Sequence, residues 1–189
     1  HTPLTKTLPV GLADSYASMR LEIGSAYTIV FFFMIIPLLL GMQWIAKPAA
    51  DLRIKLQNDI NSDAQAYQAV LAAFKLPKNT DDQKKERSKT IQQAFKTAAT
   101  VPLGVARDAL KIMDLAARTI AKGNQNAVTD GAVGVLVSRA AVLAAIYNVK
   151  VNLSAIKDPD FVKELTREVE ALKGQVIEKE KQILDPLKI

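Results

Sequence analysis

Apolar residues recur every three or four positions through most of the chain after residue 48, which is the period of a helix with one apolar face. The first such segment covers residues 49–77, and the next runs from residue 80 to about residue 122. The apolar positions of the first segment are Leu52, Leu56, Ile60, Ala64, Tyr67, Leu71 and Phe74. No segment alternates with a period of two, so the pattern predicts an all-α fold.

Local signals predict where these helices begin and end. Thr80 is followed three residues later by Gln83, as a capping box requires. Gly123-Asn124 is a strong signal for a helix end, and Asp158-Pro159 places proline at a tolerated first helical position. Pro102 lies inside an otherwise continuous helical pattern, and we expect it to kink or split the helix near Thr100 because proline lacks a backbone donor.

A row of small residues marks the predicted helix from about Val128 to Val151. The row consists of Gly131, Gly134, Ser138, Ala141 and Ala145, and Leu136, Leu143 and Tyr147 fill a neighbouring face. We expect the row to let another helix approach closely. The last helix has an apolar stripe that we expect to be buried, formed by Phe161, Leu165, Val169, Leu172, Val176 and Ile183. Together the segments predict one domain over residues 1–189, an antiparallel bundle of about five long helices.

Residues 1–46 depart from this pattern, because no charged residue occurs between Glu22 and Lys47. An apolar stretch of this length is a candidate membrane span, with Trp44 as an interfacial anchor. Two alternatives are the central helix of the bundle, covered on all sides, and a helix buried in a subunit interface. The stretch alone does not decide among these three interpretations; the family resemblance described below favours burial in protein over a membrane without excluding the membrane.

The composition restricts the chemistry. The chain has no cysteine and a single histidine, His1, which excludes thiolate sites and argues against a histidine base or a multi-histidine zinc site. Acid–base chemistry then depends on carboxylates, lysines, tyrosines or bound water. The net charge is +6, but basic and acidic residues are interleaved and no nucleic-acid motif is present, so we expect no nucleic-acid partner and no metal.

Two aspartates stand out as candidate catalytic groups. Asp130 follows the Gly-Asn stop and is the only acid between Gly123 and Lys150; its alternative role is that of a first-turn acid favoured by the helix dipole. Asp63 lies beside the apolar stripe of the first segment, with Arg139 as a candidate partner, although Arg139 also suits a salt bridge at the rim. Further polar candidates are Asn124 and Asn126, which also suit a turn, and Asn148 and Asn152, of which Asn152 favours capping.

Five sequence blocks occur in a specific order across about 100 residues. They are Asp63-Ala-Gln-Ala-Tyr67, Leu76-Pro-Lys-Asn-Thr80, Ala99-Thr-Val-Pro-Leu103, Gly123-Asn-Gln-Asn-Ala-Val-Thr-Asp130, and Asn148-Val-Lys-Val-Asn-Leu153 followed by Ile156-Lys-Asp158 and Phe161. In this set residues 63–161 closely resemble the formiminotetrahydrofolate cyclodeaminase and methenyltetrahydrofolate cyclohydrolase family. The first third departs from it, because Leu4-Thr5-Lys6 follows Thr2-Pro3 where the family has a glycine run.

The resemblance implies a cytoplasmic, homodimeric folate enzyme without a tightly bound cofactor, whose substrate is a tetrahydrofolate derivative with or without a polyglutamate tail. It implies catalysis by Asp130 and Asp63 and substrate binding by Gly123, Asn124, Asn126, Asn148 and Arg139. The expected reaction is cyclisation of 5-formiminotetrahydrofolate with release of ammonia, with methenyl hydrolysis as the alternative. Lys84, Lys85 and Arg87 could attract the glutamate tail, but a solvated charged face explains them better. Non-catalytic alternatives are a membrane-anchored bundle and a helical scaffold that has lost activity.

Overall fold

The computed structural model describes the backbone of residues 21–187 and the side chains of residues 45–187. These residues form four α-helices and one short 3-10 helix, without a strand. The elements are α2 (Leu21–Lys75), α3 (Asp81–Lys122), η2 (Gln125–Ala127), α4 (Val128–Leu153) and α5 (Pro159–Leu184). The all-α prediction is confirmed for this part of the chain, with four long helices rather than about five.

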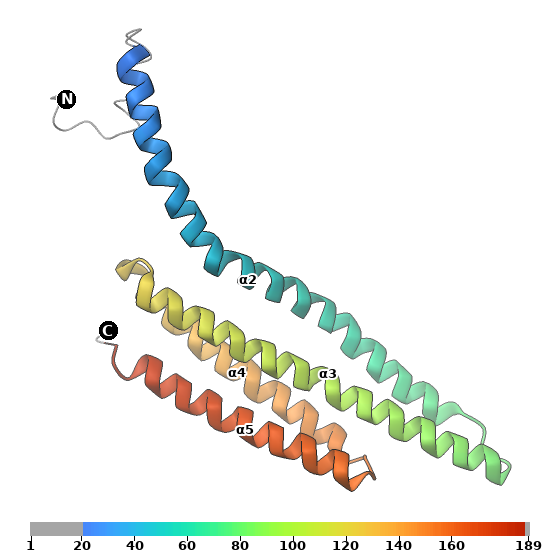
Figure 1. The fold of residues 1–189 in the computed structure, drawn as a ribbon. Helices are drawn as coiled ribbons and strands as arrows, with labels where there is room; N and C mark the ends of the chain where they lie inside the picture. Colours follow the sequence, from blue (N-terminus) through green and yellow to red (C-terminus); the bar gives the residue numbers. More distant parts are fainter. Residues whose placement is uncertain (1–20, 188–189) are drawn as a thin grey trace. The chain divides into compact units, whose positions relative to one another are not determined.

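The chain divides into two units, residues 1–48 and residues 49–189. The second unit holds all the side-chain contacts described below. Within it, successive helices run in opposite directions (Figure 1). Its main core joins α3, α4 and α5, and the largest fully buried side chains there are Leu103, Met113, Val135, Val142, Val149, Val169 and Val176. Each such side chain contributes about 1.5–3 kcal/mol through burial.

The predicted helix ends are confirmed. Thr80 caps α3, and its side chain and that of Gln83 form the reciprocal capping box. Asp158 caps α5 by accepting from Phe161 N, with Pro159 as the first residue of the helix. Gly123 ends α3 and donates to Thr119 O at 2.8 Å. A Cβ at Gly123 would lie 2.3 Å from that oxygen, so this close approach requires glycine.

The expectation that Pro102 splits its helix is wrong, because α3 is one continuous helix from Asp81 to Lys122. Proline removes the N–H that would bond to the carbonyl four residues earlier, here that of Ala98. Asn152 on α4 supplies a replacement donor, since its Nδ2 lies 2.9 Å from Ala98 O. Asn152 therefore supplies the hydrogen bond that Pro102 cannot make within α3. The C-cap residue of α4 is Ser154.

The small-residue row of α4 packs against α3, as its composition predicted. An added Cβ at Gly131 would lie 2.5 Å from Ile120 Cγ1, and one at Gly134 would lie 3.4 Å from Ala116 Cβ. The stripe of α5 is buried at Leu165, Val169, Leu172 and Val176, with Phe161 and Ile183 at its half-buried ends. Gly131 and Gly134 therefore contact α3 closely, whereas Ala141 near the other end of the row is exposed.

Most residues of the apolar stripe predicted for residues 49–77 do not pack against α3. Ile60 is 69% exposed and Tyr67 60% exposed. The buried residues of this segment are Ala66, Val70 and Ala73, which pack against Ile91, Ala94 and Ala98 of α3. This part of α2 therefore contacts α3 through Ala66, Val70 and Ala73, while its larger apolar residues Ile60 and Tyr67 are on the surface.

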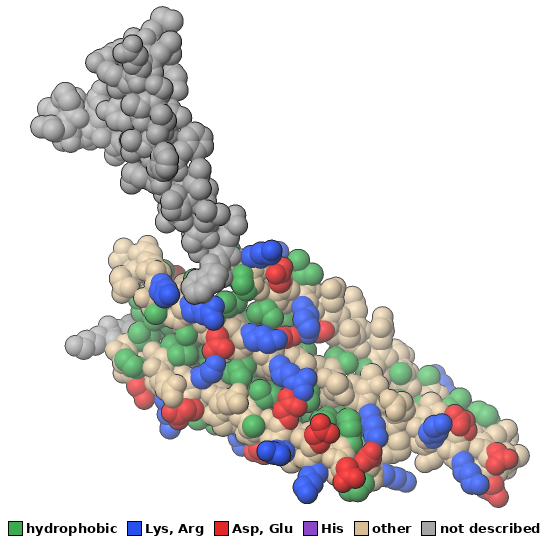
Figure 2. All heavy atoms as spheres, viewed as in Figure 1, with side chains coloured by type: hydrophobic (Ala, Val, Ile, Leu, Met, Phe, Trp, Pro, Cys, Tyr) green, Lys and Arg blue, Asp and Glu red, His purple; other side chains and the backbone are tan. Residues whose placement is uncertain are grey.

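The predictions for residues 23–46 concern side chains outside the described set, although the backbone is helical from Leu21. Among the described residues, the stretch Gln125–Leu153 is long and apolar enough to cross a membrane by length and composition. A core helix meets the same criterion, and one face of α4 lies in the core described above. On the face shown in Figure 2, acidic and basic side chains are interleaved, without a continuous patch of one sign.

Candidate functional site

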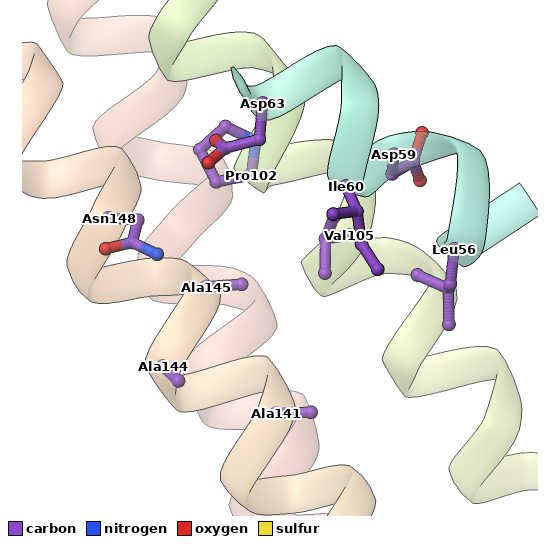
Figure 3. A pocket seen from close by; sticks show the side chains of 10 residues that line it. All are labelled: Leu56, Asp59, Ile60, Asp63, Pro102, Val105, Ala141, Ala144, Ala145 and Asn148. Carbon is purple, nitrogen blue, oxygen red and sulfur yellow. The ribbon is translucent and has the colours of Figure 1, made fainter. Parts of the chain in front are cut away.

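A cleft lies between the second half of α2 and α4, and α3 forms its floor. It consists of two adjoining hollows of about 400 and 380 Å³ that share Asp63 and Asn148. The first hollow, shown in Figure 3, is lined by Leu56, Asp59, Ile60, Asp63, Pro102, Val105, Ala141, Ala144, Ala145 and Asn148. The second adds Tyr67, Val70, Phe95, Ala98, Val151 and Asn152. We call the two hollows together the Asp63 cleft; their volumes lie in the range of ligand sites.

Helical spacing explains why these residues meet. Asp63 and Tyr67 are four residues apart on α2, so they occupy one face on successive turns. Asn148 and Asn152 have the same spacing on α4. The alanines of α4 that face α2 leave the space open, since small side chains on one wall cannot fill it.

Asp63 is the polar centre of the cleft. Its carboxylate makes no hydrogen bond or ion pair with any described residue, and Figure 3 shows it directed into the hollow from α2, with the amide of Asn148 on the facing wall. An ionised carboxylate accepts protons, and a primary amide both donates and accepts hydrogen bonds. The pair can therefore bind a planar polar heterocycle and remove a proton from a nucleophile.

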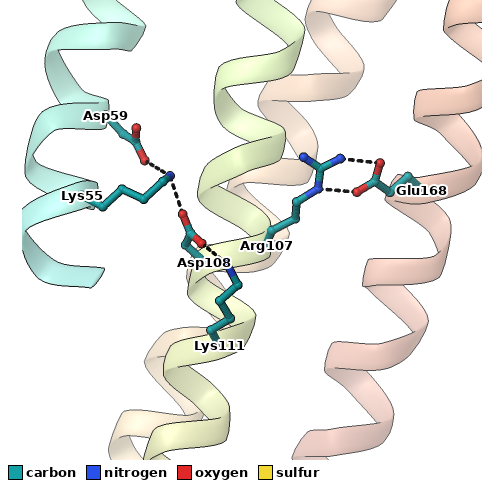
Figure 4. Close-up of polar contacts among 6 residues, drawn as sticks. All are labelled: Lys55, Asp59, Arg107, Asp108, Lys111 and Glu168. Carbon is teal, nitrogen blue, oxygen red and sulfur yellow. Dashed lines mark hydrogen bonds and ion pairs between the residues drawn. The ribbon is translucent and has the colours of Figure 1, made fainter. Parts of the chain in front are cut away.

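A second acid, Asp59, also lines the cleft but is held by Lys55. Lys55 Nζ lies 3.1 Å from Asp59 Oδ2 and 2.5 Å from Asp108 Oδ2 on α3 (Figure 4). These hydrogen bonds, first to Asp108 and then to Asp59, raise the pKa of Lys55 above its ordinary value. Burial alone would raise the pKa of Asp108, but the bonds from Lys111 and Lys55 together lower it. Asp63 is thus left as the uncompensated acid of the cleft.

The remaining predicted residues lie elsewhere. Gly123, Asn124, Asn126 and Asp130 form the turn between α3 and α4, which we call the 123–130 turn. Asn124 Oδ1 accepts from Asn126 N at 3.0 Å, which is the turn role open to it from sequence. Asp130 is exposed in the first turn of α4. Asp130 and Asn148 lie about 27 Å apart along α4, because each helical residue adds about 1.5 Å. One chain therefore does not bring the two groups together.

The proposed partnership of Arg139 with Asp63 is wrong. Arg139 Nε lies 2.8 Å from Glu180 Oε2, so the side chain joins α4 to α5, away from the cleft. This ion pair matches the second role predicted for Arg139, a salt bridge at the rim. Two of the basic residues considered for a glutamate tail also have local partners: Lys84 pairs with Asp81, and Arg87 donates to Phe74 O.

Sequence reasoning did not single out Asp59 and Asp108, or Tyr67 as a lining residue. Asp59 precedes Asp63 by four residues, and two acids at that spacing share a helix face. That spacing was a usable signal for Asp59. Asp108 had none, since its significance comes from burial at 3% exposure and from contact with another helix. Among the described residues, no three His, Cys, Asp or Glu side chains are grouped so that they could hold a metal ion.

Comparison with known proteins places this arrangement in a family. Residues 40–171 match the family described as Formiminotransferase-cyclodeaminase. The chain is 38% identical over 131 residues to the methenyltetrahydrofolate cyclohydrolase of Methylorubrum extorquens, covering 69% of this chain and 63% of that protein. It is 27% identical over 146 residues to the formimidoyltransferase-cyclodeaminase of Sus scrofa, covering 77% of this chain and 27% of the pig protein.

A solved structure shares the fold. The formiminotetrahydrofolate cyclodeaminase of Thermotoga maritima superposes with a TM-score of 0.61 at 22% identity, covering 93% of this chain and 73% of that chain. The present chain thus spans less than two thirds of the two curated relatives named above. The matched region, residues 40–171, contains both the Asp63 cleft and the 123–130 turn. The chain therefore belongs to the formiminotransferase-cyclodeaminase family, as its ordered sequence blocks predicted.

Proposed function

We propose that the chain is a folate one-carbon enzyme that acts on the carbon bridging N5 and N10 of tetrahydrofolate, with Asp63 as the proton-transfer group. The observation that carries this proposal is the Asp63 carboxylate, which has no partner among the residues that the structure describes and faces Asn148 across an open cleft. The substrate is a tetrahydrofolate derivative, and the protein needs no tightly bound cofactor for this chemistry.

Hydrolysis of 5,10-methenyltetrahydrofolate is the first reaction to test, because the relative of 38% identity is named for it. Water attacks the methenyl carbon, and Asp63 takes a proton from that water as the C–O bond forms. The C–N5 bond then breaks as the new hydroxyl group loses its proton to solvent and becomes the formyl C=O. N5 takes the proton held by Asp63, so the product is 10-formyltetrahydrofolate and one proton is released overall. The methenyl group is cationic, so a nearby carboxylate also attracts the substrate. Proton transfer of this kind contributes about 10²- to 10⁴-fold to a rate.

Cyclodeamination is the second candidate, favoured by the Asn148–Leu153 block. Here N10 attacks the formimino carbon on N5, Asp63 accepts the N10 proton, and the amino group leaves as ammonia after it gains a proton. Both reactions place a nucleophile and the same carbon next to one base. Holding the reacting atoms in place supplies much of the rate in each case.

The shape of the cleft suits a pterin ring with an extension. The hollow around Tyr67, Asn148 and Asn152 offers an aromatic face, the amide of Asn148 and the amide oxygen of Asn152 for a flat heterocycle, since Asn152 Nδ2 already donates to Ala98 O and Asn148 O. A polyglutamate tail would leave the cleft toward solvent, where acidic and basic side chains are interleaved on the face shown in Figure 2. We therefore expect tail length to affect KM only weakly.

We also propose that the chain forms a homodimer through the outer face of α4. That face carries an exposed apolar stripe in which Val137 is 62%, Tyr147 70% and Val151 71% exposed. The stripe continues through Val133, Ala140 and Ala144 at steps of three and four residues. Ala144 and Val151 also line the Asp63 cleft, so the proposed interface would border the cleft. Analytical ultracentrifugation tests it: the parent protein should sediment as a dimer and Val137→Asp as a monomer. A parent protein that sediments as a monomer at micromolar concentration would end this part of the proposal.

The activity itself is tested with purified protein and each substrate in turn, following the absorbance of the methenyl form. Faster loss of the methenyl signal than in buffer identifies the hydrolase. Faster gain of that signal from 5-formiminotetrahydrofolate, with release of ammonia, identifies the cyclodeaminase. If both rates equal the uncatalysed rates, the proposed function is wrong.

A further inference from the structure

Asp108 is a buried carboxylate that the proposed mechanism does not use. Its side chain is 4% exposed and accepts from Lys111 Nζ at 2.7 Å and from Lys55 Nζ at 2.5 Å. Burying a carboxylate is costly unless charged partners compensate it. One lysine of α3 would already supply a counter-charge, so the second bond, which comes from α2, calls for a separate explanation.

The bond to Lys55 fastens a part of α2 that has little other anchorage. The buried apolar contact between α2 and α3 is formed by Ala66, Val70 and Ala73 with their partners on α3, and Phe74 packs edge-to-face on Phe95. All these residues of α2 come after Asp63 in the helix. From residue 49 to residue 63 no side chain of α2 is buried, and Ile60 is 69% exposed. The ion pairs Arg107–Glu168 and Lys150–Glu170, in contrast, join α5 to α3 and to α4.

The cleft-lining residues of α2 lie next to this ion pair. Leu56, Asp59 and Asp63 follow Lys55 along the helix, and Asp63 lies about 12 Å beyond Lys55 along the axis. Lys55 also holds Asp59 through a 3.1 Å bond (Figure 4), so that acid is neutralised while Asp63 is not. A single ammonium group therefore affects both the placement of the α2 wall and the number of free negative charges in the cleft.

We infer that Lys55 and Asp108 are positioning residues that set the distance of Asp63 from Asn148 and keep Asp59 out of the reaction. This inference rests on the proposed function for its effect on turnover, but its structural part stands independently. Displacing a catalytic group by about 1 Å costs on the order of 10²-fold in rate. Loss of the Lys55 charge should therefore lower kcat while leaving KM nearly unchanged, since most of the cleft wall remains.

The test compares Lys55→Met with Arg107→Met. Arg107 is the matched control, because it lies next to Asp108 on α3 and bonds Glu168 at 2.5 and 2.7 Å, but it does not touch α2. We expect Lys55→Met to lose roughly 10- to 100-fold in kcat with KM within about threefold, and Arg107→Met to keep kcat within about threefold. Lys55→Arg, which retains the charge, should recover most of the loss. Equal kcat values for the two methionine variants would overturn the inference.

A second measurement does not depend on activity. The chain has no cysteine, so Gln57→Cys on α2 and Glu164→Cys on α5 give a clean pair of sites for spin labels. The distance distribution from double electron–electron resonance should broaden in Lys55→Met and stay as in the parent in Arg107→Met. An unchanged distribution in Lys55→Met would overturn the inference. If the parent protein shows neither folate reaction while the distribution broadens, the proposed function fails and the anchoring of α2 by Lys55 stands.

Discussion

The Asp63 cleft and the 123–130 turn contain the same kinds of residue, an aspartate and asparagines, but use them differently. In the turn, the Asn124 side chain is engaged by Asn126 N and Gly123 closes α3 on Thr119 O. In the cleft, the carboxylate of Asp63 and the amide of Asn148 have no partner among the described residues and line a hollow. Polar groups whose bonds are already satisfied build structure, whereas polar groups left free beside a cavity are available to a ligand.

The largest effect should come from Asp63→Asn. This change keeps the shape of the side chain and removes its charge and basicity. If Asp63 is the base, kcat should fall by about 10²- to 10⁴-fold while KM changes little. The rate is measured with methenyltetrahydrofolate and with formiminotetrahydrofolate. A variant that retains parent turnover on whichever substrate the parent converts would remove Asp63 from the mechanism.

The floor of the cleft offers the next test, through Asn152 and Pro102. Asn152→Ala leaves the Ala98 carbonyl without a donor at a buried position, so the free energy of unfolding should fall by about 1–3 kcal/mol. In a Pro102→Ala background the backbone N–H returns and supplies that bond. Asn152→Ala should then cost clearly less, which a double-mutant cycle in urea measures. Equal costs in both backgrounds would show that Asn152 does not serve the proline position.

Asp108 predicts a dependence of stability on pH. Its pKa is lowered, so its contribution is present above its ordinary value of 3.8 and is lost as the pH falls through the lowered pKa. The pKa of Lys55 is raised, so its contribution is present below 10.5 and is lost as the pH rises through the raised value. Asp108→Asn should cost about 1–3 kcal/mol near neutral pH and flatten the acid limb of the unfolding curve. An acid limb identical to that of the parent would contradict this assignment.

The 123–130 turn should give the smallest effect. Asp130→Asn removes a first-turn acid from α4, which is worth about 0.3–1 kcal/mol through the helix dipole. We expect a slightly lower melting temperature and turnover within about threefold of the parent. A folded Asp130→Asn variant with a loss of turnover as large as that of Asp63→Asn would remove the distinction between the two regions.

Some features of the fold were predictable from the sequence, and others were not. The ends of α3 and α5 were predictable because Thr80, Gly123 and Asp158 act through their own neighbours. The continuity of α3 through Pro102 was not, because the compensating donor comes from Asn152, about 50 residues away in sequence. The packing face of α2 was missed for a related reason: apolar periodicity identified the face with large residues, while α3 is approached through Ala66, Val70 and Ala73.

In the candidate site too, local features were predictable and contacts between distant residues were not. The family resemblance, carried by several separate blocks, placed Asp63, Asn148 and Asp130 in one predicted site, and the structure separates Asp130 from the other two along α4. Arg139 was a candidate partner for Asp63 or for a salt bridge at the rim, and the structure shows the salt bridge, with Glu180 of α5. Which residues share a cleft depends on the order in which helices pack, and local sequence carries little information about that order.

The central claim is that folate binds at the Asp63 cleft and not at the 123–130 turn. The most direct measurement is an NMR titration of the isotope-labelled protein with 5-formyltetrahydrofolate, following the backbone amides and the side-chain amides of the asparagines. The account predicts that the signals of Asp63, Tyr67 and Asn148 shift together along one saturable curve, while those of Asn124 and Asn126 stay within the spread of the remaining residues. Saturable shifts centred on Gly123–Asp130, with Asp63 and Asn148 unmoved, would contradict it.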